Sequence, residues 1–534
     1  MGRPRGPAHR RLLRHRAGPH PGATGGPSFR ARRIALPPQS IPEAKGAGAG
    51  PPLRLAASLI LISPEPVLRV LWVHRSEANP FLGGFHSFPG GRMSPEDGPT
   101  DGEDALELAM LRCAVRETFE ETGIFVGVQG PKPDRAAQRA LREQVLNGNA
   151  EFWPSIERIG LSLDRSAFRM SGRWVTPHFS RARFDTMFFV AELGQAEAPD
   201  VWPGELSSGE WIEPDRALKL WEEDRVTLAM PTLYAIRVIA EGTHDLSARL
   251  RAVPEANAVP SRHVILHPGI VMVPLRTETL APATHTNAAV IGDGEVVVID
   301  PGTADPSELK SLYEVVDAAT AGGGKVAAVL LTHRHKDHVS GADAVRGRYG
   351  APVWGHPLVS DRVPLDRELK EGDMVELTGP HPRRVLALHT PGHSRSHLAF
   401  FEERSRTLCA GDLVSTLGTV VVDPPDGNMG DYMRSLERIK QLKATVLIPG
   451  HGPPSRGVDH LLAALLEHRR MRESRILKSL EAGPMTEELL REEVYRDTPG
   501  APPALAARTL EAHLERLVEE GRIRREPGRV MLAT

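Results

Sequence analysis

The densest group of metal-binding residue types in the chain lies between residues 332 and 338, which read Thr-His-Arg-His-Lys-Asp-His and follow an apolar run. Residues two apart on an extended segment point the same way, so His333 and His335 can hold one cation. Asp337 and His338 can then turn toward a second cation. Imidazole and carboxylate are ligands that zinc accepts. The spacing therefore predicts a metal site, and we expect it to hold two metals.

The predicted site has the character of a catalytic centre. A structural zinc site is normally closed by cysteine, and this chain has only two cysteines, Cys113 and Cys409, far apart in the sequence. Water would complete the coordination of a site built from histidine and aspartate alone. We therefore expect chemistry at this site.

Three further candidate ligands stand downstream, each beside a glycine and after an apolar run. His393 lies in Thr-Pro-Gly-His, Asp412 in Gly-Asp and His451 in Pro-Gly-His-Gly. The order HxHxDH, TPGH, GD and PGHG resembles the metallo-β-lactamase superfamily. The upstream stretch 296–302, Val-Val-Val-Ile-Asp-Pro-Gly, is similar to the strand and turn that open that fold. The resemblance covers roughly residues 264–460.

The resemblance implies a role for each of these residues. Two zinc ions close together would lower the pKa of a shared water, so that a bridging hydroxide attacks an ester, a thioester or a phosphodiester. Asp337 would take part in catalysis as well as in binding. Four other histidines match no ligand motif, and we expect them to be loop or structural residues: His356, His381, His389 and His397. The implied ligands are His333, His335 and His393 for the first zinc, Asp337, His338 and His451 for the second, and Asp412 as the bridge.

A second motif lies far upstream, where Phe-Pro-Gly-Gly-Arg at 88–92 precedes a helical pattern over 104–122. Glu117, Glu120 and Glu121 share one face of that helix, because they are three and four residues apart. Like charges placed in this way repel, and bound cations offset the repulsion. Carboxylates of this kind suit magnesium or manganese.

The helix resembles the second half of the Nudix box, R-E-U-x-E-E-x-G-U, in which U is aliphatic. The resemblance implies that Glu120 and Glu121 bind the metal and that Glu117 is a ligand or the general base. Arg116 would orient a carboxylate, and Gly91 would offer its carbonyl oxygen. The implied reaction is hydrolysis of a diphosphate by water.

The motif departs from the full Nudix box at several positions. Gly91 lies 25 residues before Arg116, Leu108 stands where glutamate is expected, and Thr118 replaces an aliphatic residue. The acidic insertion 94–103 reads as a lengthened loop. A longer loop after FPGG resembles the Nudix branch that acts on coenzyme A and acyl-coenzyme A, over about residues 54–245. The alternative is a folded domain that binds a nucleotide-like ligand without cleaving it.

The composition is that of a multidomain globular protein. The 534 residues are 40% hydrophobic and 25% charged, with a formal net charge of −2. This charge provides no global attraction for nucleic acid or an anionic membrane. Two cysteines suggest a reducing, cytoplasmic compartment, and no apolar run approaches the ~18 residues that a membrane span requires.

The two ends of the chain differ from its middle. Residues 1–50 are rich in arginine, glycine and proline, and we expect a disordered leader. A break in patterning near residues 254–260 predicts a linker over 246–263. Helical patterns begin near residue 465, and a short hairpin follows residue 522, which is the order of a winged helix. Residues 465–534 resemble the C-terminal domain of the β-lactamase-like protein 2 group.

RNA is an alternative substrate, because that group includes a single-strand endoribonuclease. Residues 465–534 contain thirteen basic and thirteen acidic residues, so their net charge is zero and attraction for phosphates is weak. A small-molecule substrate, coenzyme A or an acyl-coenzyme A, is the main hypothesis. We expect an α/β multidomain hydrolase: a Nudix α/β/α fold, an αβ/βα metallo-β-lactamase sandwich and a small winged-helix domain.

Overall fold

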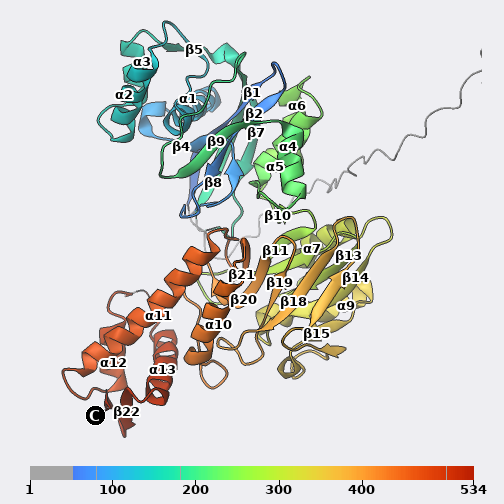
Figure 1. Cartoon of the computed structure of the whole chain (residues 1–534), viewed down its shortest axis with the longest axis vertical. Coiled ribbons are helices and arrows are strands. Elements are labelled where there is room, and N and C mark those ends of the chain that lie inside the picture. Colours follow the sequence, from blue (N-terminus) through green and yellow to red (C-terminus); the bar gives the residue numbers. More distant parts are fainter. Residues whose placement is uncertain (1–51, 80, 181, 499, 501, 534) are drawn as a thin grey trace, which may run out of the picture. The chain divides into compact units, whose positions relative to one another are not determined.

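The computed structural model describes residues 52–533 except 80, 181, 499 and 501. The expected leader, residues 1–50, lies outside the described residues. Three successive units follow along the chain (Figure 1): a sheet flanked by helices, a pair of packed sheets, and a small helical unit with a hairpin. Within the described part of the chain, no helix is both long and apolar enough to cross a membrane.

The first unit is a mixed sheet with helices on both faces (Figure 1). Its central strand β1 alternates its side chains between two buried clusters, with Leu59 and Leu61 toward α1 and Ile60 and Ile62 toward α4 and α5. The sheet order is β3-β2-β1-β8-β7, and β4 and β9 pair with β1 and β2. The strands are β1 (Leu53–Ser63), β2 (Arg69–Arg75), β3 (His86–Ser87), β4 (Gly90–Arg92), β7 (Phe168–Val175), β8 (Arg183–Glu192) and β9 (Leu206–Ile212), with the separate pair β5 (Val128–Gln129) and β6 (Ser162–Leu163).

The helices of this unit include one in the segment that we expected to be a linker. Helix α6 packs on β7, because Leu246 and Leu250 are buried and the Ser247 hydroxyl donates to the Met170 carbonyl at 2.6 Å. The segment 246–263 is therefore folded against the first unit along part of its length. The helices are α1 (Glu103–Thr122), α2 (Arg135–Leu146), α3 (Phe152–Arg158), α4 (Pro214–Glu222), α5 (Met230–Ala240) and α6 (Leu246–Arg251), with short 3-10 turns η1 (Pro95–Asp97), η2 (Arg165–Ala167) and η3 (Pro254–Ala256).

The second unit is a sandwich of two sheets with helices outside each (Figure 1). One buried cluster lies between the sheets, a second lies under α7 and α9, and a third lies under α10 and α11. This is the expected αβ/βα arrangement. The first sheet runs in the order β10 (Val264–His267), β11 (Ile270–Arg276), β12 (His285–Ile291), β13 (Glu295–Ile299), β14 (Lys325–Leu331), β15 (Val353–Gly355) and β16 (Arg367–Glu368).

The second sheet and the helices complete the sandwich. Its strand order is β17 (Met374–Leu377), β18 (Arg383–His389), β19 (Leu398–Glu402), β20 (Thr407–Ser415) and β21 (Val446–His451). The helices are α7 (Pro306–Ala319), α8 (Lys336–Val339), α9 (Ala342–Tyr349) and α10 (Met429–Gln441), with the 3-10 turn η4 (Pro357–Val359).

The core between the two sheets is shared with the first unit. Phe85 and Phe179, which come from the first unit, belong to the same buried cluster as the strands of both sheets. Nearby, the buried Arg383 on β18 pairs with Asp224, which follows α4, at 2.9 Å, and with Glu402 at 3.3 Å. The first two units are therefore joined by apolar packing and by a buried ionic contact.

One continuous helix, α11 (Val458–Leu480), connects the sandwich to the third unit. Its first half, with Leu462 and Leu466, packs on α10, and its second half, with Ile476 and Leu480, enters the core of the third unit. The helix begins at Val458, before the expected start near residue 465, because its apolar spacing already includes Val458 and Leu462. The other elements are α12 (Glu487–Val494), α13 (Pro503–Glu519), β22 (Ile523–Glu526) and β23 (Arg529–Leu532), in the expected winged-helix order.

Candidate metal centres

The loops after β14 and β18, together with Asp412 within β20, bring the first group of predicted ligands together. Ligand atoms of His333, His335, His393 and Asp412 lie within 4.8 Å of one another. The Nδ1 atom of His335 is 3.0 Å from Nε2 of His333 and 2.9 Å from Nε2 of His393. Three ring nitrogens so close cannot all share protons in linear hydrogen bonds, so their convergence favours a cation between them.

A second group forms beside the first. Ligand atoms of Asp337, His338 and His451 also lie within 4.8 Å of one another. Asp412 stands between the groups: its Oδ1 is 3.3 Å from Nε2 of His338 and 3.2 Å from Nε2 of His451, while its Oδ2 is 3.5 Å from Nε2 of His393. A carboxylate with one oxygen toward each group is placed to bridge two cations.

The strand β20 supplies Asp412 in a different local setting from the one expected. We expected Asp412 to follow an apolar run; it lies within β20, which continues to Ser415. Its pairing with β21 shifts register on either side of Gly411, so the backbone is irregular where Asp412 leaves the sheet. His451 is the last residue of β21 rather than part of the turn after it.

Hydrogen bonds at the outer ring nitrogens fix how three of the histidines face the centre. Nδ1 of His393 lies 2.7 Å from the carbonyl oxygen of Val421, and Nδ1 of His451 lies 2.8 Å from that of His285. Nδ1 of His333 lies 3.0 Å from the Thr332 hydroxyl. A carbonyl can only accept, so Nδ1 carries the proton in His393 and His451, and the lone pair of Nε2 points into the centre.

Asp300 organises the same layer from beneath the second group. Its carboxylate accepts the Thr332 backbone N–H at 2.8 Å and the Thr332 hydroxyl at 2.6 Å. It also lies 2.8 Å from Nδ1 of His338. The residue is buried in a left-handed conformation with φ 47°, which only a few residue types adopt readily. Asp300 therefore orients His338 directly and His333 through Thr332.

The electrostatics of the two groups differ. Burial, together with the neighbouring imidazoles, lowers the pKa of His333 well below its ordinary value and lowers that of His335 to about 4. Burial also opposes protonation of His338, but the Asp412 and Asp300 carboxylates outweigh it and raise the pKa of that histidine. The first group is therefore neutral and ready to bind, whereas a cation entering the second group must displace a proton.

The donor set fits two zinc ions. Nε2 of His338 and Oδ1 of Asp412 are buried and have no hydrogen-bond partner among the described residues. Buried polar atoms normally have a partner, and a cation would satisfy both. His335 is 41% exposed, far more than the other ligands of its group, so the centre opens to solvent at this residue. Nitrogen and carboxylate donors with one open side are typical of catalytic zinc.

Among the four histidines expected to be loop or structural residues, His397 lies closest to the centre. Its ring is fully buried, its Nδ1 lies 2.9 Å from the Thr390 hydroxyl, and its ring centroid is 5.3 Å from that of His333. It supports the ligand layer from behind and belongs to neither ligand group.

The Nudix-like carboxylates gather around a buried arginine on α1. Arg116 donates from Nη1 to Glu117 at 2.9 Å and to Glu120 at 3.0 Å. Its other side binds both carboxylate oxygens of Asp97 at 2.9 Å. Among the described residues, three or more histidine, cysteine, aspartate or glutamate side chains bring their ligand atoms within 4.8 Å of one another at two places only. Both are the groups around Asp412. The carboxylates of Glu117, Glu120 and Glu121 do not form such a group; Arg116 contacts the first two through the same nitrogen.

Glu121 and Gly91 complete this second centre. The Glu121 carboxylate accepts the backbone N–H of Gly90 at 2.9 Å, on the strand that pairs with β1. A Cβ at Gly91 would lie 2.3 Å from Oε2 of Glu117, so the strand passes close to this carboxylate. Burial raises the pKa of Glu117 to about 7 and that of Glu121 to about 8, and the Glu117 charge adds to the effect on Glu121. Carboxyls of this kind release protons when a cation binds.

Several supporting residues were not predicted from the sequence. Asp97 lies in the insertion that we expected to be a lengthened loop; it is fully buried and pairs with Arg116. The available signal was Arg116 itself, because a buried arginine among glutamates needs a fixed partner. Asp300 could have been noticed because it directly follows a buried apolar strand. The backbone acceptor at Val421 left no signal in the sequence.

The comparisons with known proteins agree with this architecture. Residues 281–451 match the family model described as metallo-beta-lactamase superfamily, residues 100–239 match the NUDT19 Nudix domain, and residues 486–529 match the beta-lactamase associated winged helix domain. The chain belongs to the metallo-beta-lactamase superfamily, with a Nudix domain before the catalytic fold and a winged helix after it. It is a hydrolase by both family memberships.

Two curated proteins and one solved structure are similar to parts of this chain. The beta-lactamase-like protein 2 homolog of Caenorhabditis elegans is 30% identical over 243 residues, which are 44% of this chain and 79% of that protein. A hydroxyacylglutathione hydrolase of Bdellovibrio bacteriovorus is 34% identical over 155 residues, 29% of this chain and 57% of that protein. A crystal structure of a beta-lactamase domain protein from Burkholderia ambifaria is 25% identical, covers 52% of this chain and 96% of that structure, and has a TM-score of 0.44.

Proposed function

We propose that the chain is a hydrolase with two independent metal centres, one for an acyl thioester and one for the diphosphate of coenzyme A. The observation that carries the proposal is the position of Asp412, which turns one carboxylate oxygen to each of two groups of inward-facing ligands. Zinc would be held by His333, His335, His393, Asp337, His338 and His451, with Asp412 between the two ions. When bound, two zinc ions supply a water of lowered pKa and polarise the group under attack.

The residues of the chain account for the other requirements of hydrolysis at this centre. Asp337 is 15% exposed and its Oδ2 lies 3.6 Å from Nε2 of His451, so it can accept a proton from the attacking water. The exposed edge of His335 marks the side from which a substrate carbonyl approaches. Outer hydrogen bonds at His393 and His451 prevent the rings from turning, which preserves the geometry between turnovers.

The choice of a thioester follows from the relatives. The similar Bdellovibrio protein is named for hydrolysis of an acylglutathione, in which the acyl group is carried on a thiol sulfur. A coenzyme A thioester carries the same bond and also a diphosphate, which is the group that a Nudix site cleaves. One substrate class would therefore serve both centres.

At the Nudix centre, we propose that Glu117, Glu120 and Glu121 bind magnesium or manganese, with Gly91 offering its carbonyl oxygen. Arg116 holds Glu117 and Glu120 in place before a cation enters, since it donates to both. Glu117 is a metal ligand or the general base in this proposal; burial raises its pKa to about 7 before a cation binds, so metal binding would release a proton at neutral pH. The long insertion contributes to this arrangement through Asp97.

RNA cleavage receives less support. A winged helix that binds RNA needs free basic side chains. On the wing of this chain, Arg525 pairs with Glu511 at 2.6 Å and with Glu487 at 2.5 Å. Arg522 and Arg524 also lie near glutamates. The positive charge of the wing is therefore largely neutralised within the domain.

Product analysis by mass spectrometry tests the proposal. Coenzyme A and acetyl-coenzyme A are incubated with the wild type, Glu120→Gln and His335→Ala in the presence of magnesium and zinc. We expect 4′-phosphopantetheine products that disappear only in Glu120→Gln, and deacetylation of acetyl-coenzyme A that disappears only in His335→Ala. If the wild type leaves both compounds intact but cleaves single-stranded RNA, the proposal is wrong and the endoribonuclease hypothesis replaces it.

A further inference from the structure

The acceptor that orients His393 lies on an irregular segment, residues 416–428, between β20 and α10. The carbonyl oxygen of Val421 lies 2.7 Å from Nδ1 of His393. No strand or helix fixes the backbone of this segment. Its position must therefore come from contacts with other parts of the molecule, and an error there would rotate the ring of a proposed zinc ligand.

A single buried side chain on α11 holds the segment beside that acceptor. Arg469 is 1% exposed and donates from Nη2 to the carbonyl oxygen of Val420 at 2.5 Å, one residue before Val421. The side chains of Val420 and Val422 are buried in the same apolar cluster as Leu462 of α11. The polar contact and the packing together fix the direction of the peptide between Val420 and Val421.

The same guanidinium supports the other side of the first ligand group. Its carbon atom lies 5.0 Å from the centre of the Tyr432 ring, a cation–π distance. The Tyr432 hydroxyl donates at 3.1 Å to the carbonyl oxygen of Leu413, which follows Asp412 in the chain. Arg469 therefore contacts the immediate support of two proposed ligands, His393 and Asp412.

Tyr432 also fixes the turn that carries His393. A Cβ at Gly392 would lie 2.2 Å from Cα of Tyr432, and Gly392 has φ 142°, so the turn packs directly on the first turn of α10. The backbone of Tyr432 therefore positions the turn that carries His393, while its hydroxyl contacts the residue after Asp412. Because Arg469 lies over the Tyr432 ring, its position bears on the support of the first ligand group.

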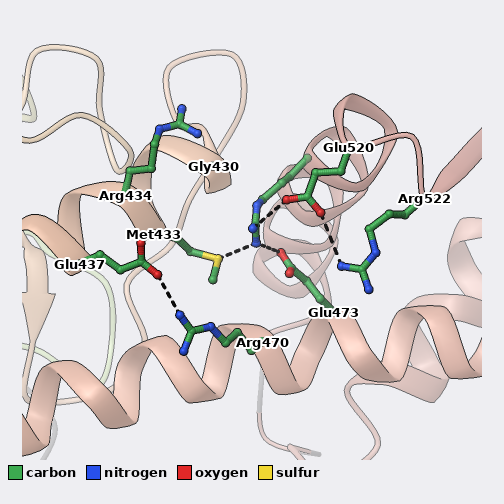
Figure 2. A pocket seen from close by; sticks show the side chains of 9 residues that line it. Gly430, Met433, Arg434, Glu437, Arg470, Glu473, Glu520 and Arg522 are labelled. Carbon is green, nitrogen blue, oxygen red and sulfur yellow. Dashed lines mark hydrogen bonds and ion pairs between the residues drawn. The ribbon is translucent and has the colours of Figure 1, made fainter.

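Further ion pairs keep α11 and α13 in place against α10. Arg508 on α13 pairs with Asp423 of the irregular segment at 3.0 Å. A cavity of about 350 Å³ is lined by residues of these helices, and Arg516 donates to Glu473 at its edge. Figure 2 shows Arg470 paired with Glu437 beside it. These contacts are at the surface or line the cavity, whereas Arg469 is inside the protein.

We propose that Arg469 is a positioning residue for the first zinc site, so that the helix leading into the winged-helix unit is part of the catalytic scaffold. Burying a guanidinium is costly unless its contacts compensate. Here the compensating contacts are a backbone carbonyl and an aromatic face, and both lead to proposed ligands. The inference rests on the proposed function, because it requires that His393 and Asp412 bind a metal.

Zinc affinity tests the inference without relying on turnover. The zinc-free full-length protein is titrated against a chromophoric chelator for wild type, Arg469→Met and Arg469→Lys. Loss of a group that orients a ligand typically weakens metal binding about 10–100-fold. We expect the larger loss in Arg469→Met at the zinc equivalent that His393 holds, and a smaller loss at the other, because Asp412 is the proposed bridge. Arg469→Lys, which keeps the charge but not the planar fork, should recover part of the affinity.

Arg470→Met is the matched control, because Arg470 is the next residue on α11, is 53% exposed and pairs only at the surface with Glu437. Its zinc affinity should equal that of the wild type. Wild-type affinity in Arg469→Met, or an equal loss in Arg470→Met, would overturn the inference. If Arg469→Met does not fold, Arg469→Lys decides in the same way. A wild type that binds no zinc would overturn the proposed zinc centre itself, and this inference with it.

Discussion

The side chain of Asp300 gives the sharpest test of how the second ligand group is built. Replacing it by asparagine keeps the size of the side chain and one accepting oxygen. The Thr332 backbone N–H can only donate, so the amide oxygen stays in the place of Oδ1. The amide nitrogen then replaces Oδ2, which faces both Nδ1 of His338 and the Thr332 hydroxyl, and it cannot accept from either. The Thr332 hydroxyl can turn to accept instead of donating. We therefore expect the loss to fall on His338.

The magnitude follows from the charge and burial of this contact. A hydrogen bond to a charged group contributes about 1.5–3 kcal/mol, and Asp300 is only 2% exposed, so solvent does not replace it. The zinc-free protein should lose stability of that order. Zinc affinity at the group that contains His338 should fall about 10–100-fold, which corresponds to about 1.4–2.7 kcal/mol.

Two measurements and one control make the expectation refutable. Unfolding by guanidinium chloride gives the stability of the zinc-free protein, and chelator competition gives the zinc affinity. Asp293→Asn is the control, because Asp293 also contacts a histidine, His381, in the same domain but away from the ligand groups. If Asp300→Asn retains wild-type affinity for both zinc ions, the role assigned to Asp300 is wrong.

Three further predictions concern charged groups elsewhere. Arg116→Met should lower stability by about 3–5 kcal/mol in thermal or chemical unfolding, because it leaves Asp97 buried without its partner; an unchanged stability would contradict the assigned pairing. Glu117 and Glu121 have pKa values of about 7 and 8, above the ordinary 4.5, so the folded protein keeps protons that the unfolded chain has lost, and magnesium-free stability falls as pH rises through this window. Magnesium requires the ionised carboxylates, so its stabilising effect on the melting temperature should grow between about pH 6 and about pH 8.5, and a flat profile would argue against these ligands. Arg383→Met should destabilise the protein by about 3–5 kcal/mol while leaving zinc affinity intact, and a matching loss of zinc would show that its effect is not local.

The sequence could indicate that the proposed ligands lie together, because the spacing of four of them is local. His333, His335, Asp337 and His338 lie on one turn, and strand ends place the distant partners at the same edge. The order of the three folds could also be predicted, since each has its own motif or pattern. The motifs therefore indicate which side chains are candidate ligands.

The supporting residues could not be predicted in the same way. Asp97 reads as one acid in a turn-rich insertion, and only the folded chain brings it to Arg116, 19 residues later. Val421 acts through its backbone, which has the same chemistry at every residue. The start of α11 was placed too late because Val458 follows a stretch rich in glycine and proline. Such features depend on contacts between distant segments.

The two phenylalanines that join the first unit to the sandwich also bear on how the fusion persists. Phe85 and Phe179 complete the core between the two sheets of the neighbouring domain. Burying a phenylalanine contributes about 1.5–3 kcal/mol to stability. Separate domains would lose about 3–6 kcal/mol of this stabilisation and would each expose an apolar surface. The Nudix domain and the sandwich are therefore expected to depend on each other. If they were separated, the phenylalanines would be exposed and the core between the two sheets would be incomplete.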